Sequence, residues 1–170
     1  GEIALCILSA VNVGGLNDLS ELENICDLSV RALEQIIDYQ DYPVKAAEVS
    51  TKARRSLGIG YIGLAHYLAK NGVKYSDPKA WDLVDRLSEA FQYHLLRASN
   101  NIAKEKGKCE AFDGTKYADG LLPIDHYKKD VDKIVPHKQR MAWESLRKDI
   151  AKYGLRHSTL SAQMPSESSS

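Results

Sequence analysis

The chain of 170 residues has no excess of charge of either sign, because 23 Lys and Arg residues balance 23 Asp and Glu residues. Duplex nucleic acid and anionic membrane surfaces both attract a basic field, so this balance favours neither as a partner. The chain also lacks the run of about 18 apolar residues that a membrane-spanning helix needs. No secretory signal pattern is visible at its amino end.

Cysteine is scarce, with only Cys6, Cys26 and Cys109. An odd, widely spaced set is not a disulfide framework, and no pair has the spacing of metal ligands. We therefore expect a reducing, cytoplasmic compartment and no metal site. The chain does not begin with Met and has strand-like apolar segments near both ends, so we interpret it as a piece of a longer polypeptide.

Hydrophobic periodicity predicts a helix-rich α/β architecture. Residues 3–13 are almost continuously apolar, which is typical of a strand buried on both faces. Further strands are expected at about 57–61 and 155–164. Apolar residues at helical spacing predict helices that cover about 19–39, 78–106 and 138–153. These strands are too few to close a sheet, so residues 1–170 are expected to be one partial domain whose missing strands come from outside the chain.

Several local details follow from the same patterns. Ser20 and Glu23 have the spacing of a capping box at the start of the first helix, and Asn17 and Asp18 offer alternative caps. The apolar stripe of that helix includes Ile36, and the stripe of the long second helix includes Trp81. Residues 73–75 are expected to form a short extended piece.

A glycine motif, Gly58-x-Gly60-x-x-Gly63, matches the dinucleotide-binding fingerprint and has Asp77 about nineteen residues further on. An NAD-dependent oxidoreductase is therefore one alternative. The context is poor, because residues 53–57 are too polar for the first strand of such a fold and Asp77 is better explained as a helix cap before a proline. We favour a structural use of these glycines, which let a strand pass closely under a helix.

The carboxyl end is rich in hydroxyl groups and follows a strand-like segment that a proline ends. The residues concerned are Pro165, Ser166, Glu167, Ser168 and Ser169. Hydroxyl and backbone N–H donors just past a strand can bind an anion. Composition alone also fits a flexible tail, which would make the chain a non-catalytic helical interaction module.

The order and spacing of several segments resemble one family along the whole chain. These segments are Gly-Glu-Ile-Ala-Leu-Cys at 1–6, Leu-Gly-Ile-Gly at 57–60, Tyr-Leu-Ala-Lys-Asn-Gly at 67–72, Tyr-Ser-Asp at 75–77, Leu-Pro-Ile-Asp at 122–125, Gly-Leu-Arg-His-Ser-Thr-Leu-Ser-Ala at 154–162 and Met-Pro-Ser-Glu-Ser-Ser at 164–169. They resemble the catalytic barrel of the class I ribonucleoside-diphosphate reductase large (alpha) subunit. The resemblance implies a helix-rich part of a ten-stranded α/β barrel, incomplete at both ends.

In that family a thiyl radical removes the 3′-hydrogen of a ribonucleoside diphosphate, water leaves the 2′ carbon, and two further cysteines supply the reducing equivalents. The resemblance implies that Cys6 is the second member of this redox pair, with its partner outside the chain. It implies no role for Cys26 or Cys109.

The residues from Pro165 to Ser169 match the family's substrate diphosphate turn, in which Glu167 would contribute its backbone N–H. Ser168 replaces a threonine often found there and keeps the hydroxyl. His157 and Gln163 stand where bacterial relatives often have asparagine and an apolar residue.

The resemblance also implies cofactors and partners, none of them expected to bind this chain alone. They are a radical from a metal-containing small (beta) subunit, ATP or dNTP effectors, thioredoxin or glutaredoxin as reductant, and a second large subunit in a dimer. The loop with the radical cysteine lies upstream of Gly1 in the family, so the isolated chain is not expected to be active.

Overall fold

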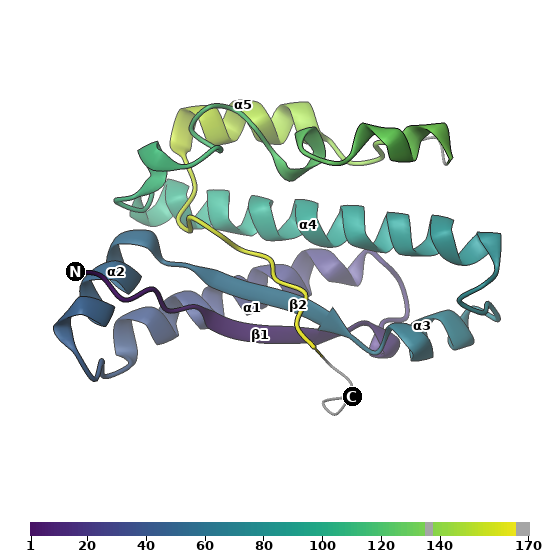
Figure 1. The fold of residues 1–170 in the computed structure, drawn as a ribbon, viewed down its shortest axis with the longest axis horizontal. Helices are drawn as coiled ribbons and strands as arrows, with labels where there is room; N and C mark the ends of the chain where they lie inside the picture. Colours follow the sequence, from purple (N-terminus) through teal and green to yellow (C-terminus); the bar gives the residue numbers. More distant parts are fainter. Residues whose placement is uncertain (135–137, 166–170) are drawn as a thin grey trace.

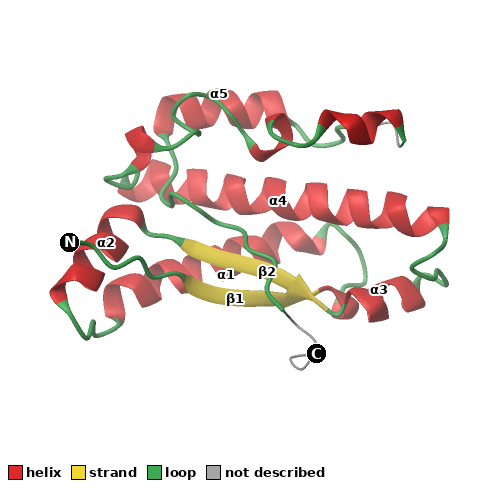
Figure 2. Ribbon diagram, in the orientation of Figure 1, coloured by secondary structure: helices red, strands yellow, loops and turns green. Residues whose placement is uncertain are grey.

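The structure is a computed structural model that describes residues 1–134 and 138–165. Its helices and strands are arranged as a small sheet beside a stack of helices (Figures 1 and 2). In chain order they are β1 (Ile7–Asn12), α1 (Glu21–Tyr39), α2 (Lys45–Arg54), β2 (Leu57–Ile62), α3 (Leu64–Lys70), α4 (Pro78–Lys106) and α5 (Trp143–Tyr153). Between α4 and α5 the described chain forms only loops and short 3-10 turns, as expected for a stretch broken by glycine and proline.

The strands β1 and β2 pair in parallel, in a register that runs from Ile7 opposite Leu57 to Asn12 opposite Ile62. In Figure 1 the sheet faces the viewer, α1 lies behind it and α4 runs alongside. One face of the sheet therefore packs on helices. The opposite face, which we call the open face, carries Leu8, 62% exposed.

The prediction that the first strand is buried on both faces is wrong, because one face of β1 is exposed. Exposed and less exposed residues alternate along β1, and the strand begins at Ile7, where pairing with β2 begins, and not at Ile3. Within the described residues no helix covers this face. The continuous apolar run of the sequence therefore indicates a surface that this chain leaves uncovered.

The core lies between the helices and the inner face of the sheet. Its fully buried side chains include Leu22, Cys26, Ile37, Ile59, Leu87, Leu95, Ile102 and Trp143. They come from α1, β2, α4 and α5, so the predicted apolar stripes of these helices are largely confirmed. Cys26 lies on the inner stripe of α1 and is a packed core thiol.

The carboxyl end forms what we call the terminal segment, residues 155–165. It runs beside β2 but joins the sheet only through an isolated parallel bridge between Ile59 and Ser161. The Leu57 N–H donates to the Thr159 carbonyl at 3.0 Å, and the Ala162 N–H donates to the Ile59 carbonyl at 3.2 Å. The predicted strand at 155–164 is therefore only partly formed.

Four local predictions are wrong. Ser20 has helical backbone angles and makes no side-chain cap bond; instead Asp18, one of the alternative caps, accepts the Ser20 N–H at 2.7 Å. Ile36 and Trp81 are 42% and 54% exposed, since no neighbouring element covers those edges of the apolar stripes. Residues 73–75 form no strand. The last helix begins at Trp143 rather than near 138.

Candidate functional site

Cys6 stands immediately before β1, and its thiol lies on the open face. A Cβ placed on Gly58 of β2 would lie 2.9 Å from the Cys6 sulfur, 2.6 Å from Leu8 Cδ2 and 3.3 Å from Ala162 Cβ. The thiol, the second strand and the terminal segment therefore meet at one point. Partial burial raises the pKa of the Cys6 thiol above its usual value, so the thiol is protonated at neutral pH.

The terminal segment crosses the open face at Gly60 (Figure 1, yellow). A Cβ on Gly60 would lie 2.4 Å from the Ala162 carbonyl oxygen and 2.7 Å from the Met164 sulfur, so only glycine fits at this crossing. The Gln163 side chain then takes over the pairing with β2, because its Nε2 donates to the Tyr61 carbonyl at 2.7 Å.

The structure places Pro165, exposed, as the last described residue of this crossing chain. The other predicted anion-binding residues, Ser166, Glu167, Ser168 and Ser169, lie outside the described residues.

The glycine motif serves the packing of the chain on itself. Gly58 and Gly60 make room for Cys6, Leu8 and the terminal segment, so the close neighbour is an extended chain and not the predicted helix. Gly63 has a left-handed φ of 76° at the start of α3. Asp77 occupies the N-cap position of α4, as expected, but its side chain makes no cap bond, because its carboxylate accepts the Lys74 N–H at 2.8 Å outside the helix.

A buried charged cluster lies behind the sheet, and sequence reasoning missed it. Glu34 on α1 is 1% exposed and accepts the Nε–H of Arg55 at 2.7 Å and of Arg156 at 2.8 Å. The oxygen that accepts from Arg55, Oε2, also faces His157 Nε2 at 3.0 Å. Burial pushes the pKa of Glu34 upward, but the hydrogen bonds from His157, Arg55 and Arg156 outweigh burial and bring the pKa down to about 2.

Within this cluster the order Ser99, His157, Glu34 is that of a hydrolase triad. Ser99 Oγ lies 2.9 Å from His157 Nδ1, and burial lowers the pKa of His157. All three side chains are buried, however, so no substrate could reach the serine. The cluster is therefore not a hydrolase site. The only sequence signal for it is that Arg55 and Arg156 directly precede segments that run into the sheet.

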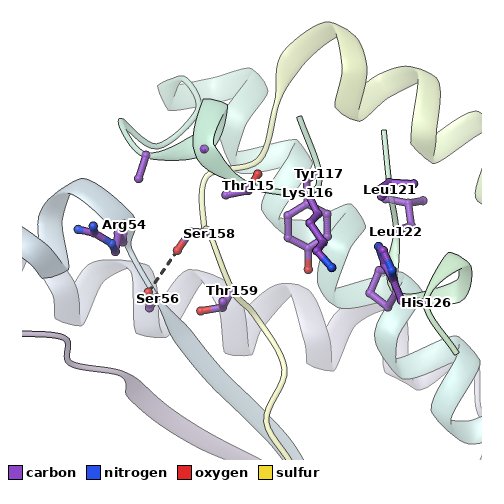
Figure 3. A pocket seen from close by; sticks show the side chains of 13 residues that line it. Arg54, Ser56, Thr115, Lys116, Tyr117, Leu121, Leu122, His126, Ser158 and Thr159 are labelled. Carbon is purple, nitrogen blue, oxygen red and sulfur yellow. Dashed lines mark hydrogen bonds between the residues drawn. The ribbon is translucent and has the colours of Figure 1, made fainter. Parts of the chain in front are cut away.

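A cavity of about 570 Å³ opens at the start of β2 and of the terminal segment (Figure 3). Its polar lining comes from basic and hydroxyl side chains, including Arg54, Lys116 and His126, and the hydroxyls of Ser56 and Ser158 lie 3.2 Å apart. None of its lining residues is a cysteine or an acid. Neither Cys6 nor Gly58, where the thiol meets the terminal segment, lines this cavity.

Comparison with known proteins decides the family. The family model described as "Ribonucleotide reductase, barrel domain" matches residues 1–170. The chain belongs to this family.

Curated relatives of this reductase domain are similar along the chain. The ribonucleoside-diphosphate reductase subunit alpha of Haemophilus influenzae is 61% identical over 170 residues, which are 100% of this chain and 22% of that protein. Ribonucleoside-diphosphate reductase 1 subunit alpha of Escherichia coli K12 is 56% identical over 134 residues, covering 79% of this chain and 18% of that subunit. The subunit alpha of phage T4 is 44% identical over 171 residues, covering 99% of this chain and 22% of that subunit.

The chain thus spans about a fifth of the length of the reductase subunits that it matches. The predicted resemblance and the predicted fold class, a helix-rich part of the reductase α/β barrel, are confirmed. In the described ranges 1–134 and 138–165, no three His, Cys, Asp or Glu side chains are grouped so that they could hold a metal ion. Nor is any described helix both long and apolar enough to cross a bilayer.

Proposed function

We propose that this chain forms part of the large subunit of a ribonucleoside-diphosphate reductase, which makes 2′-deoxyribonucleotides for DNA synthesis by a radical mechanism. The single observation that carries this proposal beyond family membership is the meeting of Cys6 and the terminal segment at Gly58. The thiol and the chain that leads to the proposed diphosphate turn share the open face.

In this proposal Cys6 is one member of the redox pair, and its partner lies outside the chain. The two thiols would together pass two electrons and two protons to the substrate, whose 2′-hydroxyl leaves as water and is replaced by hydrogen, while one S–S bond forms between the sulfurs. A dithiol protein would later reduce that bond. The structure supports this role in two ways. The thiol reaches the uncovered face of a rigid sheet, and its raised pKa keeps it in the protonated form that such a donor needs.

The second proposed element is the diphosphate turn formed by Pro165, Ser166, Glu167, Ser168 and Ser169. Hydroxyls and backbone N–H groups would hold the phosphates, with Glu167 contributing its N–H because its carboxylate would repel them. Support comes from the path of the terminal segment, which reaches Pro165 directly after crossing the sheet at Gly60.

The remaining reductase components would be supplied by other parts of the assembly. They include the rest of the large subunit, a small subunit with a metal-dependent radical, ATP or dNTP effectors, a thioredoxin or glutaredoxin, and a second large subunit. A reducing, cytoplasmic setting suits the three cysteines, all of them free thiols.

The test uses the full-length subunit with its small subunit and a dithiol protein as reductant. We expect Cys6→Ser to abolish repeated turnover while substrate still binds, because the redox pair cannot form its disulfide. Cys109→Ala is the matched control, since that thiol is 1% exposed and faces the core. Normal multiple turnover by Cys6→Ser would refute the redox assignment.

The diphosphate turn is tested separately with Ser166→Ala combined with Ser168→Ala. We expect the KM for the ribonucleoside diphosphate to rise, because two hydroxyl donors to the phosphates are lost. An unchanged KM would refute the turn assignment without affecting that of Cys6.

A further inference from the structure

The carboxylate of Glu34 joins the beginnings of two extended segments that are far apart in the sequence. Arg55 lies just before β2, whereas Arg156 and His157 lie at the start of the terminal segment. All three donate to the same two carboxylate oxygens, at 2.7, 2.8 and 3.0 Å. Glu34 therefore holds the beginnings of both segments against one turn of α1.

The beginnings of the two segments are matched residue for residue. Arg55 stands two residues before Leu57, and His157 stands two residues before Thr159. The first backbone hydrogen bond between β2 and the terminal segment joins Leu57 and Thr159, from the Leu57 N–H to the Thr159 carbonyl at 3.0 Å. Fixing both segments at their beginnings on one carboxylate therefore fixes the alignment of the terminal segment along β2.

Arg55 is held in a backbone conformation that ordinary residues avoid, with φ 50°. Its guanidinium also pairs with Asp38 one turn along α1, at 3.0 and 2.8 Å. Two carboxylates of one helix thus stabilise the sharp change of direction at which α2 ends and β2 begins.

The imidazole of His157 spans two helices. Its Nε2 faces the Glu34 carboxylate and so carries the proton, which leaves Nδ1 to accept the Ser99 hydroxyl at 2.9 Å. The backbone N–H of His157 in turn donates to the same Ser99 oxygen at 3.2 Å. Because all three residues are buried, each bond has no competing water.

Alignment matters because consecutive residues of the terminal segment have different surroundings. Leu160 is buried in the core, the Ser161 hydroxyl donates to Gln92 Oε1 on α4 at 2.6 Å, and Ala162 lies over Gly58 on the open face. A slip by one residue would take Leu160 out of the core and move Pro165 along the sheet.

We propose that Glu34 and His157 are positioning residues, which set the alignment of the terminal segment and thereby the place at which the diphosphate turn begins. This inference rests on the proposed function of that turn. Neither residue touches the substrate, since both are buried behind the sheet.

The test compares Glu34→Gln with Glu105→Gln in the full-length subunit, assayed with its small subunit. Glu105 makes the matched control because it also pairs with an arginine between α4 and α1, at 2.6 Å to Arg31, but is 48% exposed. We expect Glu34→Gln to raise the KM for a ribonucleoside diphosphate by about tenfold to a hundredfold, with a much smaller change in kcat. Glu105→Gln should change the KM by less than about twofold.

A purely structural role would give a different pattern. The rate at which iodoacetamide alkylates Cys6, followed by peptide mass spectrometry, reports whether β1 and β2 remain in place. We expect that rate to be unchanged in Glu34→Gln. Faster alkylation of Cys6, together with a fall in kcat as large as the rise in KM, would show that the whole sheet is destabilised. That result would overturn the proposal.

If Glu34→Gln does not fold, His157→Leu provides the test, because leucine can neither donate to Glu34 nor accept from Ser99, while Glu34 stays paired with both arginines. A KM equal to that of the unaltered subunit would refute the positioning role. The combined Ser166→Ala and Ser168→Ala variant separates the two proposals. If the double variant raises the KM while Glu34→Gln and His157→Leu do not, only the positioning role fails. If the double variant leaves the KM unchanged, both the turn and its positioning fail.

Discussion

Replacing Gly60 with alanine should displace the terminal segment from the sheet. The new Cβ would lie 2.4 Å from the Ala162 carbonyl oxygen, where ordinary contacts begin at 3.4 Å, so the chain must move by about 1 Å. The obstacle is backbone and cannot rotate away. At Gly58 the nearest atoms are the ends of the Leu8 and Cys6 side chains, which can rotate away. Gly58→Ala should therefore destabilise the fold less than Gly60→Ala.

The expected cost follows from two contributions. Overpacking costs about 1–3 kcal/mol, and the hydrogen bond from Ala162 to Ile59, at 3.2 Å, would be lost at about 1 kcal/mol. Alanine restricts the unfolded chain and offsets about 0.4–1 kcal/mol of this. We therefore expect a net destabilisation of about 2–3 kcal/mol for Gly60→Ala.

Hydrogen exchange of the full-length subunit, followed by mass spectrometry on peptides that cover 159–164, measures this effect locally. Protection should fall by about 30- to 150-fold in Gly60→Ala. Gly114→Ala is the control, because its φ is not left-handed and a Cβ there meets nothing within 4 Å. If the two variants exchange alike, the terminal segment does not cross at Gly60 and the reasoning is wrong.

Two further predictions concern titration and thiol reactivity. Burial lowers the pKa of His157, so the contribution of neutral His157 to the free energy of unfolding is fully present above about pH 6.5 and is lost as the pH falls through the lowered pKa. The pKa of Glu34 is about 2 against the ordinary 4.5, so stability falls further below about pH 4.5. Urea unfolding between pH 8 and pH 5 should show the first loss, and His157→Gln should flatten it; an equal slope in both proteins would contradict the assignment. Cys26 and Cys109 are 0% and 1% exposed whereas Cys6 is exposed, and burial raises the pKa of Cys26 to about 12, so iodoacetamide should label both at least about tenfold more slowly than Cys6 in the folded subunit. Equal labelling of the three thiols would contradict the described packing.

Local periodicity was sufficient for most of the helices. The first and the long second helix occupy Glu21–Tyr39 and Pro78–Lys106, close to the predicted 19–39 and 78–106. Both predictions depend on apolar residues within a few turns of one another and, for α4, on a proline at its start. The order of short motifs along the chain was likewise enough to indicate the reductase barrel, which the family match confirms.

The edges of the helical stripes could not be predicted in the same way. Ile36 and Trp81 are apolar and correctly spaced, yet exposed, because spacing gives the direction of a side chain and not whether another element covers it. The same limit explains the first strand, whose apolar run predicts two covered faces although the described chain covers one.

The sequence by itself determined the helices, the parallel strands, the family and the thiol that is proposed to act in the reductase. Only the tertiary structure decided why Gly58 and Gly60 are glycines and why Glu34 is buried. The atoms that crowd Gly60 belong to residues about a hundred positions later, and Glu34 lies 21 residues from Arg55 and 122 from Arg156. Contacts over such separations leave no periodicity in the sequence, because they form only when α1, β2 and the terminal segment come together.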